Sequence, residues 1–536
     1  TAYGDADLPG NGPAISYPLI RLMNALSDGM MILVILLASV VILAISILCI
    51  RYILLTSLEK DKREIGMLKA IGISRKDIRG LYFSKFLLLS ILGMILGGAS
   101  SALIWVFLGR QMTDLYGPVD HMGRILIISL LGILLVEGMI LLSVRRTLKV
   151  TEKLSAVEAL YGLGRFERKK NRYLFLAFVT AAATALVLIP QNIATTLSSP
   201  GFVNYMGIGE SQIRIDVRQG VDMEAISQDL YQEIEEDSRT GGAVLMETRS
   251  FRIATEDGRE YRILIEEGDH GRYPVKYSEG SWPTAKDEIA LSKLLSEELG
   301  VKLGDTLTIW AGGEEKIPCR VCGIYGDVTN GGKTAKASFD VPSGDIPLMW
   351  GILYLNLKDG NSVTEWTQEF QAKVENLPAQ IRVTEISQYV LSMYGPTIKL
   401  IERAAWVSMG ASLAVLSIVV LLFMRLIVWQ ERGDCSLKKA LGFVSADIRV
   451  TYLKRCLGYI LGGLAAGIFL GIGPGQRLAG LFLGSLGASG FSFLIRPERV
   501  FFLIPLVLVL AAASCAWISL REINQIMPYE CCLRRE

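Results

Sequence analysis

The sequence predicts a membrane α-helical bundle of about seven transmembrane helices, in two related halves, with a large extracytoplasmic α+β domain. Three observations lead to this prediction. Several charge-poor runs are each long enough, at about 20 residues, to cross a bilayer as a helix. A polar region of mixed strand and helix periodicity separates the fourth run from the fifth. One segment occurs twice, 370 residues apart, which indicates a duplicated unit.

The composition excludes several classes of protein. Of the 536 residues, 51% are hydrophobic and only 20% are charged, a balance too apolar for a soluble protein of this length. The formal net charge of +2 gives no sign of a nucleic-acid partner, so the lipid bilayer is the expected environment. The eight cysteines are scattered, and only Cys319 and Cys322 fall in the large polar region. No disulfide framework is implied.

The basic residues predict the orientation of the spans. The expected spans cover residues 29–50, 86–109, 125–144, 173–190, 404–424, 456–476 and 500–520. Lys and Arg are concentrated in the connections that follow the first, third and fifth spans, and such connections face the cytoplasm. The polar region between the fourth and fifth spans is therefore expected outside the cell.

The repeated segment predicts two docking surfaces on the cytoplasmic side. Residues 64–82 read EIGMLKAIGISRKDIRGLY and residues 434–452 read DCSLKKALGFVSADIRVTY. In each copy good helix formers are followed by a glycine, which predicts a short helix with a defined end. The alternative is an amphipathic helix that lies on the membrane surface. The candidate docking residues are Glu64, Met67, Leu68, Lys69, Gly72 and Arg75 in the first copy, and Asp434, Leu437, Lys438, Lys439 and Gly442 in the second.

Each candidate docking residue has an expected role. Met67 and Leu68 are expected to fill an apolar groove on a partner, while Lys69 and Arg75 are expected to meet acidic side chains. The second copy places Leu437 and Lys438 at the matched positions, which predicts a more polar surface there.

Two further features lie inside the predicted spans. Gly93 and Gly97 match Gly463 and Gly467, and small residues at this spacing permit close helix packing in lipid. Glu137 is an acid deep in the third span, where a charge is costly unless it is protonated or paired. A structural pair within the bundle is the favoured interpretation of Glu137, and a place on a substrate or proton path is the alternative.

These motifs resemble those of the FtsX/MacB-like ABC transporter permeases, which act by mechanotransmission and include the lipoprotein-extraction permeases. The resemblance is carried by EIGMLKAIGISRKDI, by VEAL at residues 157–160, and by DEIALSKLLSEELGVKLGDTLTI with CRVCGIYGDV. The second copy matches less well, since Cys435 and Ser436 replace Ile65 and Gly66, and the segment at residues 529–532 keeps only the Glu of VEAL.

The resemblance implies a partner and a place in the cell. The repeated segments would contact a cytoplasmic ABC ATPase subunit, expected as a dimer, which would bind ATP and Mg²⁺. This chain would carry no cofactor and no catalytic site, and would lie in the bacterial cytoplasmic membrane. An extracytoplasmic partner protein is a further candidate.

The predicted domains follow from the spans and the resemblance. Residues 1–28 form an extracytoplasmic stub, 29–148 a first FtsX-like three-helix unit, 149–172 a cytoplasmic linker and 173–198 the helix that opens the second half. Residues 199–399 form the outer α+β domain with a β-rich insertion, and 400–536 form the second unit with a cytoplasmic tail. The first half lacks a fourth span, so we expect that a first span and outer domain are missing; a natural seven-span protein is the alternative.

Within the outer domain, alternation and helical spacing predict individual elements. Strands are expected at residues 212–217, 243–254, 301–309, 316–325, 352–357 and 381–386, and helices at 223–235, 287–300 and 363–375. Residues 326–334 look like a phosphate loop, but five residues rather than four separate the glycines. Cys319 and Cys322 lie three apart in a strand, on opposite faces, which suits neither zinc nor a redox pair.

The expected function is that of a permease subunit, which would couple ATP hydrolysis on a separate subunit to movement of the outer domain. The resemblance implies export or extraction of a peptide, lipoprotein or other amphiphile. Two alternatives stay open: a transmembrane regulator that activates an extracellular partner such as a cell-wall hydrolase, and a peptide sensor that transports nothing.

Overall fold

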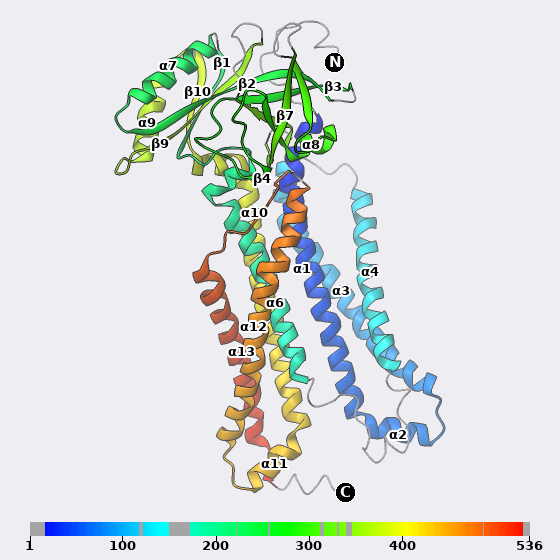
Figure 1. Ribbon diagram of the computed structural model, residues 1–536. Helices are drawn as coiled ribbons and strands as arrows, with labels where there is room; N and C mark the ends of the chain where they lie inside the picture. The colour runs from blue at the N-terminus through cyan, green and yellow to red at the C-terminus, as the bar shows by residue number, and fades with distance from the viewer. Residues whose placement is uncertain are drawn as a thin grey trace. The chain divides into compact units, whose positions relative to one another are not determined.

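The computed structural model describes residues 17–116, 122–149, 172–220, 222–255, 258–310, 316–329, 332–338, 346–485 and 487–528. Within these residues, seven helical stretches are long and apolar enough to cross a membrane (Figure 1). They are α1 (Tyr17–Lys60), α3 (Arg75–Tyr116), α4 (Met122–Leu148), α6 (Arg172–Leu197), α10 (Ile386–Gln430), α12 (Ser445–Gly484) and α13 (Ile504–Leu520), the last preceded by the π-helical turn η5 (Glu498–Leu503). Residues 150–171 of the predicted linker at 149–172, with the VEAL motif, and most of the predicted stub lie outside the described residues.

The chain forms two compact units. Unit 1 comprises Thr1–Leu36, Thr184–Ser412 and Ile468–Pro505, and unit 2 comprises Leu37–Ala183, Leu413–Gly467 and Leu506–Glu536. Unit 1 contains the predicted outer domain, and unit 2 contains both copies of the repeated segment.

In unit 2, the repeated segment forms the same structure twice. The short helix α2 (Lys62–Ala70) follows α1 after one residue and precedes α3, and α11 (Arg432–Ala440) stands in the same way between α10 and α12. The bounds of α2 and α11, and the first residues of α3 and α12, are each 370 residues apart. Sequence similarity at matched positions therefore corresponds to matched helices.

In unit 1, the first and last strands of the outer domain form one half of its sheet. The strands β10 (Ala379–Glu385), β1 (Ile213–Gly220), β9 (Leu348–Leu357) and β2 (Thr240–Ala254) lie in that order, all antiparallel. The helices α7 (Met223–Glu236) and α9 (Val363–Val374) cover one face of this half (Figure 1). Their apolar sides, including Leu230, Ile234, Trp366 and Phe370, pack on Ile213, Ile215 and Val217 of β1.

The β-rich insertion is a closed barrel. The strand β2 pairs with β3 (Glu260–Glu267), β3 with β8 (Thr334–Ala337), β8 with β5 (Glu288–Ser292), β5 with β7 (Lys316–Tyr325), β7 with β6 (Thr306–Trp310), and β6 returns to β2. The strand β4 (Tyr277–Gly280) adds to β7. Closure leaves no free edge among the six ring strands, and their inward side chains form one apolar core.

Most predicted elements of the outer domain are confirmed, with one exception. Residues 287–300 were expected to form a single helix, but they form β5 followed by the short α8 (Lys293–Leu299). The prediction is wrong because Ile289, Ala290 and Leu291 are all fully buried between β7 and β8, where a strand satisfies their backbone groups. Gly300 ends α8 at a φ of 71°, as the predicted stop requires.

The two cysteines of the outer domain lie as the alternation of β7 predicts. Cys319 is fully buried in the barrel core, while Cys322 packs on the other side, beside Tyr325 and Val275. Burial raises the pKa of the Cys319 thiol to about 12 and that of Cys322 to about 11, so both are inert thiols at neutral pH.

Candidate functional site: the two matched short helices

Both short helices end in the same hydrogen-bonded turn. At the end of α2, the Ile73 N–H donates to the Leu68 carbonyl (3.1 Å) and the Gly72 N–H to the Lys69 carbonyl (3.2 Å). At the end of α11, the N–H groups of Phe443 and Gly442 make the same two bonds. Gly72 and Gly442 have φ angles of 95° and 93°, a conformation that side-chain-bearing residues rarely adopt. The predicted glycine stops are therefore Schellman motifs.

A tyrosine anchors each short helix to the helix that follows it. The Tyr82 hydroxyl of α3 donates to the Asp61 carboxylate, just before α2, over 3.1 Å. The Tyr452 hydroxyl of α12 donates to Glu431, just before α11, over 2.5 Å. The two pairs occupy matched positions, although sequence comparison alone paired only the tyrosines.

Each short helix buries one side and exposes another in the same pattern. The exposure classes of residues 64–70 and 434–440 are identical at every position. Ile65 is fully buried and packs with Leu54, Leu58 and Val144 from α1 and α4. Cys435, its counterpart, is also fully buried. The substitutions that weaken the second copy thus lie on its inner side and leave the outer side intact.

The outer sides carry exposed apolar side chains. Met67 is 50% exposed and Leu437 is 53% exposed, as expected of residues that fill a partner's groove. The prediction for Leu68 differs from the structure, because this side chain packs against the cluster around Ile65 within its own unit. The turns after the helices add residues that the sequence analysis missed: Ile71 (78% exposed), Leu441 (70%) and Phe443 (56%). The signal available in the sequence was the presence of apolar residues on both sides of the glycine that ends each short helix.

The exposed residues of the turns differ between the copies. A more polar surface was expected at Leu437 and Lys438, and this stays a prediction. In the turn beyond them, Leu441, Phe443 and Val444 are all exposed around Gly442, where the first copy has Ile71, Ile73 and Ser74. The second turn therefore presents more apolar surface than the first.

Some charged residues of the site are exposed, and others are partly covered by the chain itself. Glu64, Arg75 and Asp434 are exposed, while Lys69 and Lys438 are partly covered. Lys438 lies over the Tyr452 ring, with its Nζ 5.6 Å from the ring centroid. Lys69, Arg75 and Asp434 all have interactions within the chain, so contact with a partner would have to compete with these.

Lys439 is engaged inside the chain rather than presented to a partner. Its Nζ donates to the carbonyls of Ile523 (2.6 Å) and Ile526 (2.7 Å), at and just after η6 (Arg521–Gln525). The Ser436 hydroxyl lies 2.8 Å from the carbonyls of Met527 and Pro528. These bonds place the segment after α13 beneath α11, and a lysine on the last carbonyls of a helix is also favoured by the helix dipole. The structure thus gives Lys439 a structural role within the chain, and its docking role stays a prediction.

The matched glycines differ between the copies. In unit 2, a Cβ added at Gly463 would lie 2.4 Å from the Ala177 carbonyl oxygen of α6, so the close helix packing expected there is present. Gly467 is buried on the same helix. Around Gly93 and Gly97, no described atom lies within 4 Å of such a Cβ. The packing expected at Gly93 and Gly97 is therefore not found among the described residues, because no described helix covers that face of α3 as α6 covers α12.

Glu137 has a polar partner on the neighbouring helix. The Ser90 hydroxyl of α3 hydrogen-bonds the Glu137 carboxylate of α4, and it also lies 3.1 Å from the Leu87 carbonyl of its own helix. This geometry favours a structural pair over a substrate path, in agreement with the interpretation from sequence.

Comparison with known families agrees with these features. The FtsX-like permease C-terminal family model matches residues 36–151 and 406–528, and each matched segment contains one short helix. Among curated proteins, no significant match to the chain was found.

Two solved structures are distantly similar. The periplasmic region of MacB from Actinobacillus actinomycetemcomitans is 12% identical, with a TM-score of 0.26, over 35% of this chain and 94% of that one. The extracellular domain of the noncanonic ABC-type transporter YknZ from Gram-positive bacteria is 13% identical, with a TM-score of 0.23, over 32% of this chain and 100% of that one. Likenesses this distant carry no argument about function.

The apolar helices of the described residues and the two matched segments define a membrane protein of the ABC transporter permease class. Both of its matched segments, residues 36–151 and 406–528, are of the FtsX-like permease type. Members of this class are the permease components of transporters and are not themselves catalytic, so the family implies a partner ATPase and a bacterial plasma membrane.

Proposed function

We propose that α2 and α11 are two docking surfaces for a separate ATPase dimer, and that the chain transmits the movement of that dimer to its outer domain. The cargo is a peptide, lipoprotein or other amphiphile that is exported or extracted. The outer domain holds a cavity lined by both charged and aromatic side chains, which suits an amphiphilic cargo.

The observation that carries the proposal is the identical build of the two short helices. Each has its inner side fixed in its own unit, a glycine turn with φ near 95°, and exposed apolar residues on the outer side. Exposed apolar residues at matched places on two helices are typical of interaction surfaces. A surface used for binding one partner twice would have this repetition.

A continuous path leads from the second docking surface to the outer domain. Strand β10 ends at Glu385, α10 begins at Ile386 and runs to Gln430, and α11 starts at Arg432. A helix of 45 residues is about 68 Å long, and this one contains Pro396 in its first third. Chain continuity through α10 is the proposed route by which movement of α11 reaches β10.

The test is copurification of the ATPase subunit from native membranes with variants of each surface. Met67→Asp with Ile71→Asp should abolish recruitment at α2, and Leu437→Asp with Leu441→Asp should abolish it at α11, because an unpaired carboxylate in an apolar groove costs several kcal/mol. Either double variant alone should eliminate ATP-driven transport.

Leu377→Asp is the matched control, since Leu377 is an exposed leucine (39%) of the outer domain. It should recruit the ATPase normally. Normal recruitment and coupling in both double variants would show that the short helices only rest on the membrane surface.

A further inference from the structure

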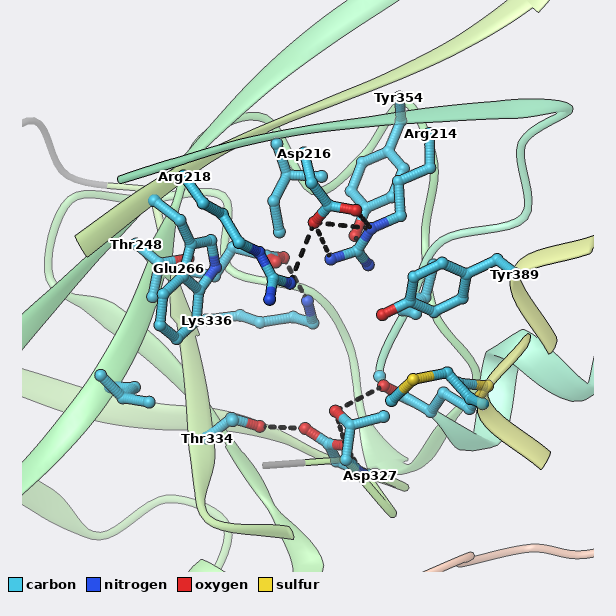
Figure 2. Close-up of a pocket in the computed structure, with 18 of the residues that line it drawn as sticks. Arg214, Asp216, Arg218, Thr248, Glu266, Asp327, Thr334, Lys336, Tyr354 and Tyr389 are labelled. Carbon is cyan, nitrogen blue, oxygen red and sulfur yellow. Dashed lines mark hydrogen bonds and ion pairs between the residues drawn. The ribbon is translucent and has the colours of Figure 1, made fainter. Parts of the chain in front are cut away.

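The outer domain contains a cavity that the sequence analysis did not anticipate. Its volume is about 510 Å³, within the range of small-molecule sites. It lies on the sheet face opposite α7 and α9, and side chains from seven strands and from the start of α10 line it. Figure 2 shows these side chains converging on an open centre.

The pattern of β1 explains why charges gather on this face. Ile213, Ile215 and Val217 point into the core beneath α7 and α9. Arg214, Asp216 and Arg218 alternate with them and therefore point to the cavity. Arg214 and Asp216 are each only 4% exposed, which is rare for charged residues unless they are paired.

The buried charges are paired, but they leave a positive surplus. The Asp216 carboxylate accepts from Arg214 (2.7 Å) and Arg218 (3.2 Å), and Lys336 pairs with Glu266. Burial opposes ionisation, yet these cations hold the pKa values of Asp216 and Glu266 below their ordinary values. The described lining contains four cationic and three acidic side chains, a surplus that favours an anion.

Two groups of the cavity lining can make further hydrogen bonds. Arg218 is half exposed and makes one contact with Asp216 through a single nitrogen, and Figure 2 shows its guanidinium pointing into the cavity. Thr248 of β2 is 3% exposed, lines the cavity, and has no hydrogen-bond partner for its hydroxyl. An unpaired buried hydroxyl is costly and therefore rare. A ligand oxygen that accepts hydrogen bonds from Arg218 and Thr248 would satisfy the Thr248 hydroxyl.

The remaining wall is apolar and aromatic. Trp350 and Ile352 of β9 line the cavity beside Thr248, and Met393 of α10 lines it from the helix. The Tyr389 ring lies over the Arg214 guanidinium (4.6 Å) and its hydroxyl points into the cavity. A ligand would need an apolar body as well as a negative group.

We infer that this cavity binds a small amphiphile through a terminal oxyanion, a carboxylate or a phosphate, held by Arg218 and Thr248 with the apolar body against Trp350 and Met393. Because Tyr389 and Met393 belong to α10, the bound ligand touches the helix that leads to α11. The inference thus deepens the proposed function by naming the chemistry of the cargo. It rests on the proposed function only where it treats the ligand as cargo whose binding is linked to α11 through α10.

The test is calorimetric titration of the full chain in nanodiscs of neutral lipid at pH 7. The probes are octanoate and octyl phosphate, with octanol and octyltrimethylammonium as matched neutral and cationic probes. Both anions should bind saturably at one site, and the other two probes should show only lipid partitioning. Arg218→Gln should weaken anion binding about tenfold, as loss of a charge-assisted hydrogen bond does. Thr248→Val should weaken it several-fold, and Thr248→Ser should restore it.

Arg252→Gln is the control, because Arg252 is an exposed arginine of β2 that lies over Trp310, outside the cavity. It should bind both anions as the unmodified chain does. Tighter binding of octyl phosphate would assign the oxyanion to a phosphate headgroup, and tighter binding of octanoate to a carboxylate. Equal titration of all four probes, or unchanged anion affinity in both Arg218→Gln and Thr248→Val, would overturn the inference. No ATPase is present in this experiment, so its failure would leave the docking proposal standing.

Discussion

Two buried titratable residues of the outer domain have pKa values shifted in opposite senses. Asp327 accepts hydrogen bonds from the Thr329 N–H (2.6 Å) and hydroxyl (2.7 Å) and from the Thr334 hydroxyl. Burial nevertheless raises its pKa to about 6. His270 lies between the carbonyls of Glu266 (3.0 Å) and Ala337 (3.1 Å), and burial, reinforced by Lys336, lowers its pKa to about 4.

These shifts predict opposing effects of pH on stability. The contribution of Asp327 is present below pH 3.8 and is lost as pH rises through about 6, because the unfolded chain ionises more easily. The contribution of His270 is lost as pH falls from 6.5 to about 4. The two slopes therefore oppose each other between about pH 4 and 6. Shifts of this size correspond to about 3 kcal/mol per group.

Asp327→Asn should therefore stabilise the protein progressively as pH rises from 4 to 7, relative to the unmodified chain, since Asn carries no charge to bury. His270→Gln should have the opposite pH dependence: its stability relative to the unmodified chain should increase as pH falls. The measurement is the melting temperature of each chain between pH 4.5 and 7.5, taken as a difference from the unmodified chain. Difference curves that are flat with pH would contradict the assigned burial of these groups.

The cavity shows how far single residues can be interpreted from sequence. The alternation of Ile213, Ile215 and Val217 with charged residues predicted a strand with one apolar face, and this is confirmed. The usual expectation is that the charged face meets water. Here Arg214 and Asp216 are buried instead, because residues from β9, β3 and α10 close over them. No local pattern records that closure.

At the scale of elements, length decided which predictions succeeded. The long apolar helices and the repeated short helices were predictable, since their patterns extend over many residues. The strand β5 has five residues and is buried on both faces, so its apolar run reads equally well as part of the helix that follows. Only its pairing with β7 and β8 selects the strand, and that information lies elsewhere in the chain.

The matched glycines give a prediction at this scale. Gly463→Leu should destabilise the protein by about 1–3 kcal/mol, because the new side chain would collide with the Ala177 carbonyl and the Thr180 side chain of α6. Gly93→Leu occupies the matched position in α3, where no described atom lies within 4 Å of the added Cβ, and it should be tolerated. Thermal unfolding of both variants in the same detergent makes the comparison. Equal losses would mean that a helix also covers α3 at Gly93.

At the scale of the whole molecule, the family and the general arrangement followed from sequence, whereas the cavity did not. The seven apolar helices need only length and composition, and the repeat needs only self-comparison. The cavity is assembled from strands as distant in sequence as β1 and β10 and is therefore visible only after folding. The second docking surface and the cavity are joined in sequence by α10, since α11 begins just after its last residue and Tyr389 lies near its first.

The most direct test of the docking claim is photo-crosslinking from the exposed turns of the two short helices. A benzophenone amino acid placed at Ile71 or Leu441 should crosslink to the ATPase subunit in native membranes, because both side chains are at least 70% exposed beside the glycine turns. The same probe at Leu134 of α4, which is 52% exposed within an apolar span, should label lipid and not the ATPase. Labelling of lipid alone from Ile71 and Leu441, in a preparation where the ATPase copurifies with the chain, would contradict the account.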